Sequence, residues 1–328
     1  MARRERSGSM TGPNGPGVAP ASRLARIALK DGRVRPALRA LLYVIAAVAG
    51  VGFVASIIFS IAVAIGPWPS RLELIVVQVI ATVIVIVALS YALRRFLDRR
   101  SAQSLGLAPD RSAMRLFCLG VSLGAGMQTV VVLVELLWGN GRVVGFSATG
   151  SSLMVVLAGA AIFIPAALSE ELSLRGYILQ NLWEEWGFVP AAILSSVAFA
   201  LLHFANPHVH EQIVLTVVSL VLYGIWACLS VRWTKSLWFA LGCHSAWNLF
   251  EGPVYGFPVS GITVPAPTVL RVSGAGPDWL TGASFGPEGG LSSIVAILVG
   301  ALVLWALFKR GAFAHAPDQR EFYARLSE

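Results

Sequence analysis

The chain has 328 residues, of which 56% are hydrophobic and 13% are charged, and its formal net charge is +8 at pH 7. Soluble domains usually contain about 25% charged residues, so this composition excludes a disordered protein, an ordinary cytosolic enzyme and a nucleic-acid binder whose basic charge lies on a folded surface. It predicts an integral membrane protein with several spans, and the basic excess must first be tested as a signal of membrane topology.

Residues 1–37 differ in composition from the rest of the chain. They are rich in Arg, Gly, Pro and Ser and contain no apolar stretch that would form a core, which is typical of disordered segments. A signal peptide would place an apolar stretch of about 7–15 residues directly behind a short basic region, whereas the first apolar run here begins late and is longer. We expect an uncleaved, disordered basic tail on the cytoplasmic side.

Membrane spans need about 20 mostly apolar residues to cross about 30 Å of hydrocarbon. Such stretches predict an all-α fold, a polytopic membrane helix bundle of about eight transmembrane helices. They cover residues 38–65, 72–93, 114–138, 152–182, 188–206, 211–231, 237–251 and 291–308. Residues 38–310 are thus expected to form one membrane domain, and residues 311–328 a cytoplasmic C-terminal tail.

The distribution of Lys and Arg predicts the orientation, because inner loops of membrane proteins are enriched in both. An even number of spans places both termini on one side. On that side lie 22 of the 25 Lys and Arg residues, and the proposed outer loops hold Arg71, Arg142 and Arg271. We therefore expect a cell-membrane protein with both termini cytoplasmic, anchored most strongly by the run RRFLDRR at 94–100.

Two further features concern packing and the outer loops. Gly120 and Gly124 are four residues apart, a spacing that lets a neighbouring helix approach closely.

The outer segment 252–290 is rich in Gly, Pro and Ser and contains no clear span, and its role stays open. No internal repeat of the kind found in many transporters is visible, which disfavours transport.

Polar clusters within the predicted spans carry the functional information, because ionisable side chains in a membrane are costly and usually mark a site or a pathway. Three such clusters occur. They read Ser169-Glu170-Glu171-Leu172-Ser173-Leu174-Arg175, Phe199-Ala200-Leu201-Leu202-His203 and His244-Ser245-Ala246-Trp247-Asn248.

Helical spacing separates the two neighbouring glutamates of the first cluster. Glu171 and Arg175 are four residues apart, so they share a helix face and are expected to form an internal ion pair. Glu170 lies about 100° around the helix from Glu171. Its carboxylate is then free to act as a base.

A helical hairpin that turns near Gly187 would bring the first two clusters to the same depth. Glu170 and His203 then each lie about 16 residues, or roughly 24 Å, from the turn. Phe199 lies one turn from His203 on the same helix and can shield it from lipid. The sequence thus predicts that a carboxylate and an imidazole converge inside the bundle.

His244 and Asn248 share one helix face and are expected to point into the same space. A carboxylate beside an imidazole can activate water, and a second imidazole with an amide can stabilise an oxyanion, which together describe amide hydrolysis without a covalent intermediate. Glu170, His203 and His244 could instead hold zinc. The residues alone leave both chemistries open.

The motifs EExxxR, FxxxH and HxxxN occur here in the order found in the CPBP family of intramembrane proteases, and the chain resembles this family over about residues 150–261. The family includes the type II CAAX prenyl endopeptidases and bacteriocin-associated homologues. The segments KSLW at 235–238 and GFPVSG at 256–261 also resemble sequences of this family. Each motif alone is weak, but three in order within predicted helices are specific.

The resemblance implies a role for each motif position. These roles are water activation by Glu170 and His203, oxyanion stabilisation by His244 and Asn248, and support of the site by Glu171, Arg175 and Phe199. A glutamate-dependent mechanism without metal is favoured for the family, so the resemblance implies no cofactor. Zinc held by Glu170, His203 and His244 is the alternative.

The sequence therefore predicts an intramembrane endopeptidase that contacts membrane lipid and cleaves a membrane-associated protein or peptide. The substrate stays open, including whether a prenyl group is recognised. The alternative from another class is a non-catalytic membrane protein of the same fold, an immunity or scaffold factor whose motif residues would tolerate substitution. A transporter is the third hypothesis.

Overall fold

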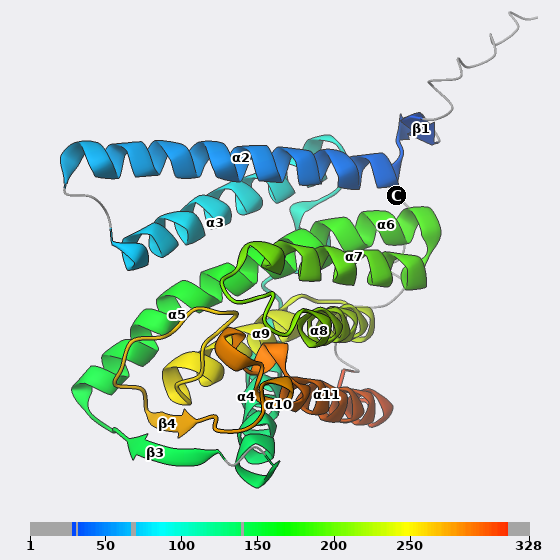
Figure 1. Cartoon of the computed structure of the whole chain (residues 1–328). Coiled ribbons are helices and arrows are strands. Elements are labelled where there is room, and N and C mark those ends of the chain that lie inside the picture. Colours follow the sequence, from blue (N-terminus) through cyan, green and yellow to red (C-terminus); the bar gives the residue numbers. More distant parts are fainter. Residues whose placement is uncertain (1–27, 31, 67–69, 139–140, 314–328) are drawn as a thin grey trace, which may run out of the picture. The chain divides into compact units, whose positions relative to one another are not determined.

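Figure 1 shows the computed structural model of the chain, which describes residues 28–30, 32–66, 70–138 and 141–313. The chain divides into two compact units, Met1–Arg35 and Pro36–Glu328. Most of the two predicted tails, 1–37 and 311–328, lies outside the described residues.

The described part of the first unit is a short antiparallel hairpin. It pairs β1 (Leu29–Lys30) with β2 (Arg33–Val34). The second unit starts at Pro36, the first residue of the first long helix, a position where proline costs no helical hydrogen bond. The first long helix therefore starts two residues before residue 38, where the sequence predicted the first span.

Seven helices in the described residues of the second unit are long and apolar enough to cross a membrane. They are α2 (Pro36–Ile65), α3 (Arg71–Phe96), α4 (Ala113–Trp138), the run formed by α5 (Gly150–Glu171) and α6 (Leu179–Trp186), α7 (Phe188–Leu202), α8 (Ile213–Thr234) and α11 (Leu291–Lys309). The predicted polytopic helix bundle is confirmed, and each of these helices covers one predicted stretch.

The predicted stretch 237–251 does not form an eighth long span. It folds as α9 (Trp238–Leu249), followed by a π-helical turn, η4 (Phe250–Val254). The 12 residues of α9 rise about 18 Å, which is short of the hydrocarbon thickness of about 30 Å. Residues 239–247 are all buried, so α9 is apolar because it packs against other helices.

Glycines allow α4 to approach α9 closely. A Cβ atom added at Gly120 would lie 2.1 Å from the carbonyl oxygen of Phe239, and one at Gly124 would lie 2.3 Å from that of Cys243. Both distances are too short for any side chain, which confirms the close packing predicted from the glycine spacing. Because His244 follows Cys243, this contact sets the depth of His244 in the bundle.

The helical hairpin predicted near Gly187 is present. α6 ends at Trp186, Gly187 has a φ of 83° and α7 begins at Phe188. Glycine adopts this left-handed conformation without the steric penalty that other residues meet. α6 and α7 lie side by side (Figure 1). The helical run that contains Glu170 and the helix that precedes His203 are therefore the two arms of this hairpin.

The basic run at 94–100 is more than a solvated anchor. Arg94 and Asp98 are buried and form an ion pair at 2.9 Å, and Asp98 also accepts a hydrogen bond from the Tyr177 hydroxyl at 2.9 Å. Arg100 pairs with Glu184 at 2.9 Å. These contacts join the end of α3 to the second half of the α5–α6 run.

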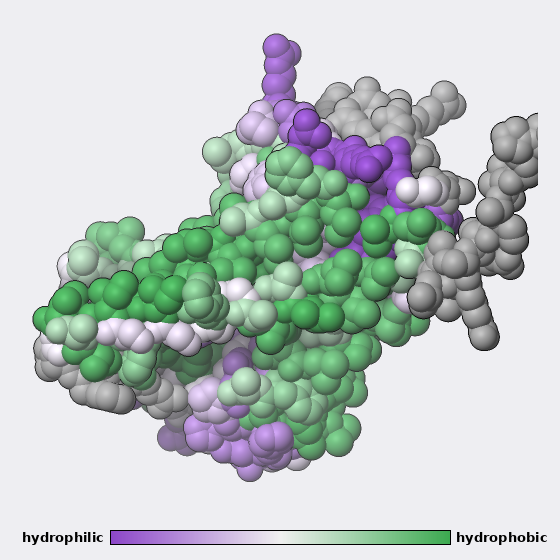
Figure 2. Space-filling view, turned by 90° about the horizontal axis from the view of Figure 1, so that it is seen from above, coloured by the Kyte–Doolittle hydropathy of each residue, from purple (hydrophilic) through white to green (hydrophobic). Residues whose placement is uncertain are grey.

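Apolar side chains cover much of the outside of the bundle. Val48 and Phe53 on α2 and Met154 on α5 are each more than 60% exposed. Figure 2 shows hydrophobic residues over most of one face, with hydrophilic residues gathered towards its edges. An apolar surface of this extent is what helices in contact with lipid require.

The segment 252–290, whose role the sequence left open, packs on the loop between α7 and α8. The backbone N–H of Ser284 donates a hydrogen bond to Glu211 at 3.0 Å. The regular elements of this segment are β4 (Leu270–Ser273), α10 (Asp278–Thr281), η5 (Ala283–Phe285) and η6 (Pro287–Gly289). β4 pairs antiparallel with β3 (Arg142–Phe146), which lies earlier in the chain.

Replacing Gly124 with Ala should destabilise the bundle. The new Cβ atom would overlap the Cys243 carbonyl, so α4 and α9 would have to separate, and overpacking of this kind costs about 1–3 kcal/mol. Thermal unfolding in detergent measures the effect. Gly126→Ala on the same helix is the matched control, because no atom lies within 4 Å of its added Cβ. Equal melting temperatures for both variants would contradict the packing.

Candidate active site

The carboxylate of Glu171 lies at the centre of the candidate site. Its Oε1 atom accepts a hydrogen bond from Arg175 Nη1 at 3.1 Å and lies 2.9 Å from His244 Nδ1. The Glu171 and Arg175 side chains are 1% and 0% exposed. A buried ion pair is stable only where hydrogen bonds compensate both charges. The predicted pair is confirmed, and it also holds an imidazole from a distant helix.

The backbone at this point is not a regular α-helix. Leu172–Ile178 form a π-helical segment, η2, between α5 and α6, and all seven residues are buried. Short π-helical segments occur within α-helices and are frequent at functional sites. The sequence did not predict this segment, because its apolar residues read as a continuation of the α-helical span.

Arg175 connects η2 to two other helices. Its Nη2 atom donates to the carbonyl oxygen of Gly224 on α8 at 3.5 Å. Its guanidinium carbon lies 4.7 Å from the ring centroid of Phe199 on α7, a position in which the aromatic face attracts the cation. Arg175 therefore holds α7 and α8 against the helix that carries both glutamates.

Phe199 packs against both candidate histidines. Its ring centroid lies 4.7 Å from that of His203 and 6.0 Å from that of His244. His203 is 8% exposed, and its Nδ1 lies 2.9 Å from the Phe199 carbonyl oxygen. An Nδ1–H that donates to this carbonyl would leave Nε2 of His203 as the ring nitrogen that faces a reactant.

Glu170 differs from its neighbour in accessibility. Its side chain is 30% exposed, and its Oε2 lies 3.8 Å from His244 Nε2. His244 thus has Glu171 at Nδ1 and Glu170 near Nε2, so the two carboxylates lie on different sides of one imidazole. In the described part of the chain no hydrogen bond or ion pair joins Glu170 to His203.

Asn248 lies one turn beyond His244 on α9 and is half-buried. It makes no hydrogen bond with the residues that the structure describes, and it does not line the pocket beside His244. The predicted residues that the structure gathers at this site are Glu170, Glu171, Arg175, Phe199, His203 and His244.

The alternative zinc site was predicted at Glu170, His203 and His244. Within the described ranges, no group of three or more His, Cys, Asp and Glu side chains is placed to hold a metal ion. Zinc sites in proteins use at least three such ligands, at about 2.0–2.3 Å from the metal. These three residues therefore do not fit a zinc ion in this arrangement.

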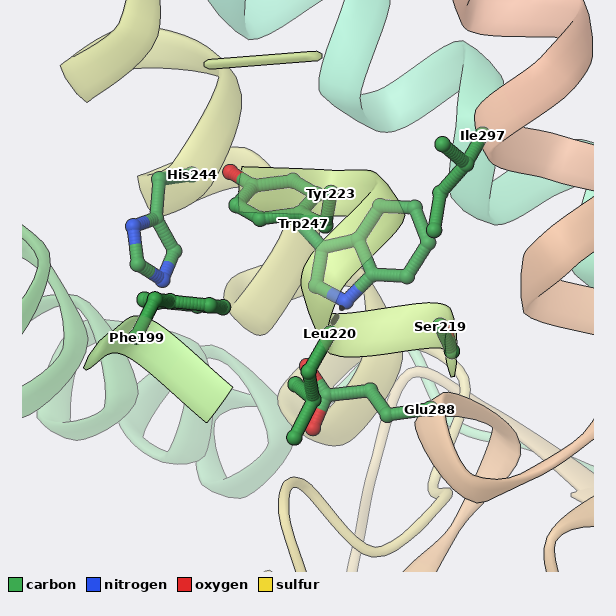
Figure 3. A pocket seen from close by; sticks show the side chains of 8 residues that line it. All are labelled: Phe199, Ser219, Leu220, Tyr223, His244, Trp247, Glu288 and Ile297. Carbon is green, nitrogen blue, oxygen red and sulfur yellow. Dashed lines mark hydrogen bonds between the residues drawn. The ribbon is translucent and has the colours of Figure 1, made fainter. Parts of the chain in front are cut away.

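A pocket that the sequence did not reveal opens beside His244 (Figure 3). It is lined by Phe199, Ser219, Leu220, Tyr223, His244, Trp247, Glu288 and Ile297. Tyr223 is 5% exposed, its ring centroid lies 5.4 Å from that of His244, and its buried hydroxyl has no hydrogen-bond partner among the described residues. Glu288 accepts hydrogen bonds from Trp247 Nε1 at 3.0 Å and from the Ser260 hydroxyl.

Only weak sequence signals point to these pocket residues. Tyr223 lies within an apolar stretch and belongs to no motif. Glu288 lies in a Gly-, Pro- and Ser-rich segment, 40 residues after Asn248. Trp247 falls inside the HxxxN motif, where its position beside His244 was the one available hint.

Residues 151–250 match the protein-family model described as "Type II CAAX prenyl endopeptidase Rce1-like". The chain is similar to this family over these residues. The match includes all three motifs and confirms the family resemblance predicted from them. The long apolar helices of the described residues indicate an integral membrane protein.

A curated relative is the protein YyaK of Bacillus subtilis (strain 168), described as uncharacterized. It is 30% identical over 141 residues, which cover 39% of this chain and 44% of YyaK. The chain thus spans less than half the length of this relative. No solved structure matches the chain.

Arg175→Met should lower both the stability and the activity. The substitution leaves the Glu171 carboxylate buried without its cation, and breaking a buried ion pair in this way costs about 3–5 kcal/mol. Thermal unfolding of the purified protein measures the loss.

The double variant Glu171→Leu/Arg175→Met provides the control. Replacing both charges with apolar groups should restore most of the melting temperature, but not the activity, because His244 has lost its acceptor. A single variant as stable as the wild type, or a double variant with full activity, would contradict this role of Glu171.

Proposed function

We propose that the chain is an intramembrane endopeptidase that hydrolyses a peptide bond of a membrane-associated protein or peptide. The observation that carries the proposal is the placement of His244, with the buried Glu171 at 2.9 Å from Nδ1 and the half-buried Glu170 at 3.8 Å from Nε2. Similarity of the surrounding residues to the Rce1-like family supports it.

Glu170 is the general base in this proposal. Its carboxylate takes a proton from a water molecule as the water oxygen attacks the carbonyl carbon of the substrate. The His203 imidazole is the second group that binds and activates that water. The same proton is then delivered to the leaving nitrogen as the C–N bond breaks, so no covalent intermediate with the protein forms.

His244 and Asn248 stabilise the oxyanion that develops at the substrate carbonyl. When His244 is protonated on both nitrogens, Nδ1–H donates to Glu171 and Nε2–H donates to the oxyanion. A donor held rigidly in a site with little water is worth far more than the same donor in bulk water. The amide of Asn248, one turn further along α9, is the second donor.

The orientation that we propose follows the charge distribution, with both termini on the cytoplasmic side of the cell membrane. The seven long helices of the described residues alone would place the termini on opposite sides, so this orientation requires the short α9 and the turn η4 to return the chain across the membrane. The second candidate function is a non-catalytic immunity or scaffold protein of the same fold. One observation favours it, because Glu170 and His203 are not joined by a hydrogen bond in the described residues. The two functions differ in whether Glu170 can be replaced.

Glu170→Gln should abolish cleavage while the protein stays folded. The amide keeps the size of the side chain but cannot accept a proton, and loss of a general base costs about 10²–10⁴ in rate. Wild-type protein and variant are reconstituted in liposomes with a library of fluorescence-quenched peptides that carry a C-terminal hexadecyl anchor, and new peptide ends are identified by mass spectrometry.

The control for this experiment is Glu211→Gln, because Glu211 is an exposed carboxylate in the loop between α7 and α8. It should cleave like the wild type. Cleavage by Glu170→Gln at the wild-type rate would overturn the proposed mechanism.

Metal removal should leave the cleavage unchanged. The three residues of the zinc alternative do not form a ligand set within the described residues, so dialysis against 1,10-phenanthroline should not lower the rate. Loss of cleavage that added zinc restores, with zinc bound stoichiometrically to the purified protein, would show that the mechanism depends on a metal.

A further inference from the structure

We infer that Arg94 is a positioning residue of the active site, because it holds the π-helical segment η2 in the conformation that pairs Glu171 with Arg175. The inference rests on the proposed endopeptidase function. It adds to the site a residue outside the region 151–250 that matches the family model. It is carried by the contacts of Arg94 with η2, by the burial of these contacts, and by the ion pair that η2 makes with the site.

A π-helix is an uncommon path for the backbone. Its hydrogen bonds join residues five apart instead of four, and it occurs mostly as a short interruption of an α-helix. In η2 the N–H of Leu179 donates to the carbonyl oxygen of Leu174 in this way. An α-helical path through the same residues would wind them more tightly and would turn α6 about its axis relative to α5. The contacts that other helices make with η2 therefore decide which path it takes.

Arg94 on α3 contacts the backbone of η2 directly. Its side chain is 0% exposed, and its Nη2 atom donates to the carbonyl oxygen of Gly176 at 3.4 Å and to the side-chain oxygen of Gln180. Its Nη1 atom forms the ion pair with Asp98 at 2.9 Å, which orients the planar guanidinium group. Gly176 directly follows Arg175, so this contact fixes the backbone next to the arginine of the site.

Tyr177 fixes η2 against the same part of α3 and against α2. Its hydroxyl donates to Asp98 at 2.9 Å, and its ring centroid lies 5.8 Å from the guanidinium carbon of Arg94. The ring also stacks on that of Tyr43 on α2, with 4.4 Å between the centroids. Both tyrosines are 0% exposed, and hydrogen bonds to charged groups are strong where water is excluded. Buried contacts from α2 and α3 thus both hold η2.

From η2 the contacts continue to the imidazole of the site. Arg175 donates to Glu171 at 3.1 Å, and Oε1 of Glu171 lies 2.9 Å from Nδ1 of His244. Loss of the Arg94 contact frees the Gly176 carbonyl and allows η2 to rewind, which moves the Arg175 side chain. A displacement of about 1 Å at a catalytic group can cost about a hundredfold in rate. Arg94 therefore acts on the reaction through the position of His244.

Membrane topology alone does not account for Arg94. In the basic run at 94–100, Arg95 and Arg99 are exposed, and an exposed arginine keeps its charge in contact with water. Arg94 is instead buried, and a buried charge is costly unless it is paired and hydrogen-bonded. The exposed arginines supply the topology signal, whereas the buried Arg94 contacts η2.

Arg94→Lys separates these two roles. Lysine keeps the positive charge but lacks the fork of donors with which arginine reaches a carboxylate and two oxygens of the α5–α6 run together. The full-length variant is assayed in liposomes with the anchored peptides described above. We expect kcat to fall by at least about tenfold with an unchanged KM, because the contacts with the substrate are untouched. Arg95→Lys, at the exposed neighbouring position, is the matched control and should cleave like the wild type.

Two further measurements do not depend on activity. Amide hydrogen exchange of residues 172–179 should be at least about tenfold faster in Arg94→Lys than in Arg95→Lys, because η2 opens more easily. The ¹⁵N signal of His244 in histidine-labelled protein should shift in Arg94→Lys, which a loss of stability alone would not cause. Gln180→Met removes one acceptor of Arg94 without leaving a charge unpaired, so it should shift the same signal if Arg94→Lys cannot be purified. An unshifted signal there would overturn the inference.

The positioning role would be overturned if Arg94→Lys kept the wild-type kcat and an unshifted His244 signal, even with faster exchange in η2. The two proposals fail in different ways. Peptide cleavage by Glu170→Gln at the wild-type rate would overturn the protease mechanism itself, while the exchange and ¹⁵N measurements still test the hold of Arg94 on η2. An inactive Glu170→Gln together with a fully active Arg94→Lys would overturn the positioning role alone.

Discussion

One buried carboxylate oxygen, Oε1 of Glu171, holds the candidate site together. It lies within hydrogen-bond distance of both Arg175 and His244, and Arg175 in turn contacts α7 through Phe199 and α8 through Gly224. Four helices therefore meet around one ion pair. Because breaking a buried ion pair is so costly, this arrangement constrains the imidazole more strongly than apolar packing alone would.

Close packing of two helices determines the position of the His244 imidazole along the bundle. Gly120 and Gly124 bring the α4 backbone against α9, and the short α9 then presents His244 at the depth of Glu171. Packing thus fixes the depth of His244, while Glu171 fixes its rotation. The half-buried Glu170 lies near the other ring nitrogen, where the proposed mechanism uses it as the base.

Much of this arrangement is local and was readable from the sequence. Hydropathy over about 20 residues predicts long helices, and the four-residue spacing of Glu171 and Arg175 predicts their pairing. Three features depend on distant residues and escaped prediction. The first is α9, which resembles a span in sequence because buried core helices are equally apolar. The second is the ion pair of Arg100 with Glu184. The third is Glu288, which lines the pocket from a loop that contains no motif.

Glu171 orients His244 by accepting its Nδ1–H, and ¹⁵N NMR of histidine-labelled protein in lipid nanodiscs can detect this proton. His244→Asn assigns the signal by removing it. We expect Nδ1 of His244 to carry a proton in the wild type, and its signal to shift in Glu171→Gln. An unprotonated Nδ1 in the wild type, or a His244 signal that is the same in Glu171→Gln, would show that Glu171 does not orient the imidazole.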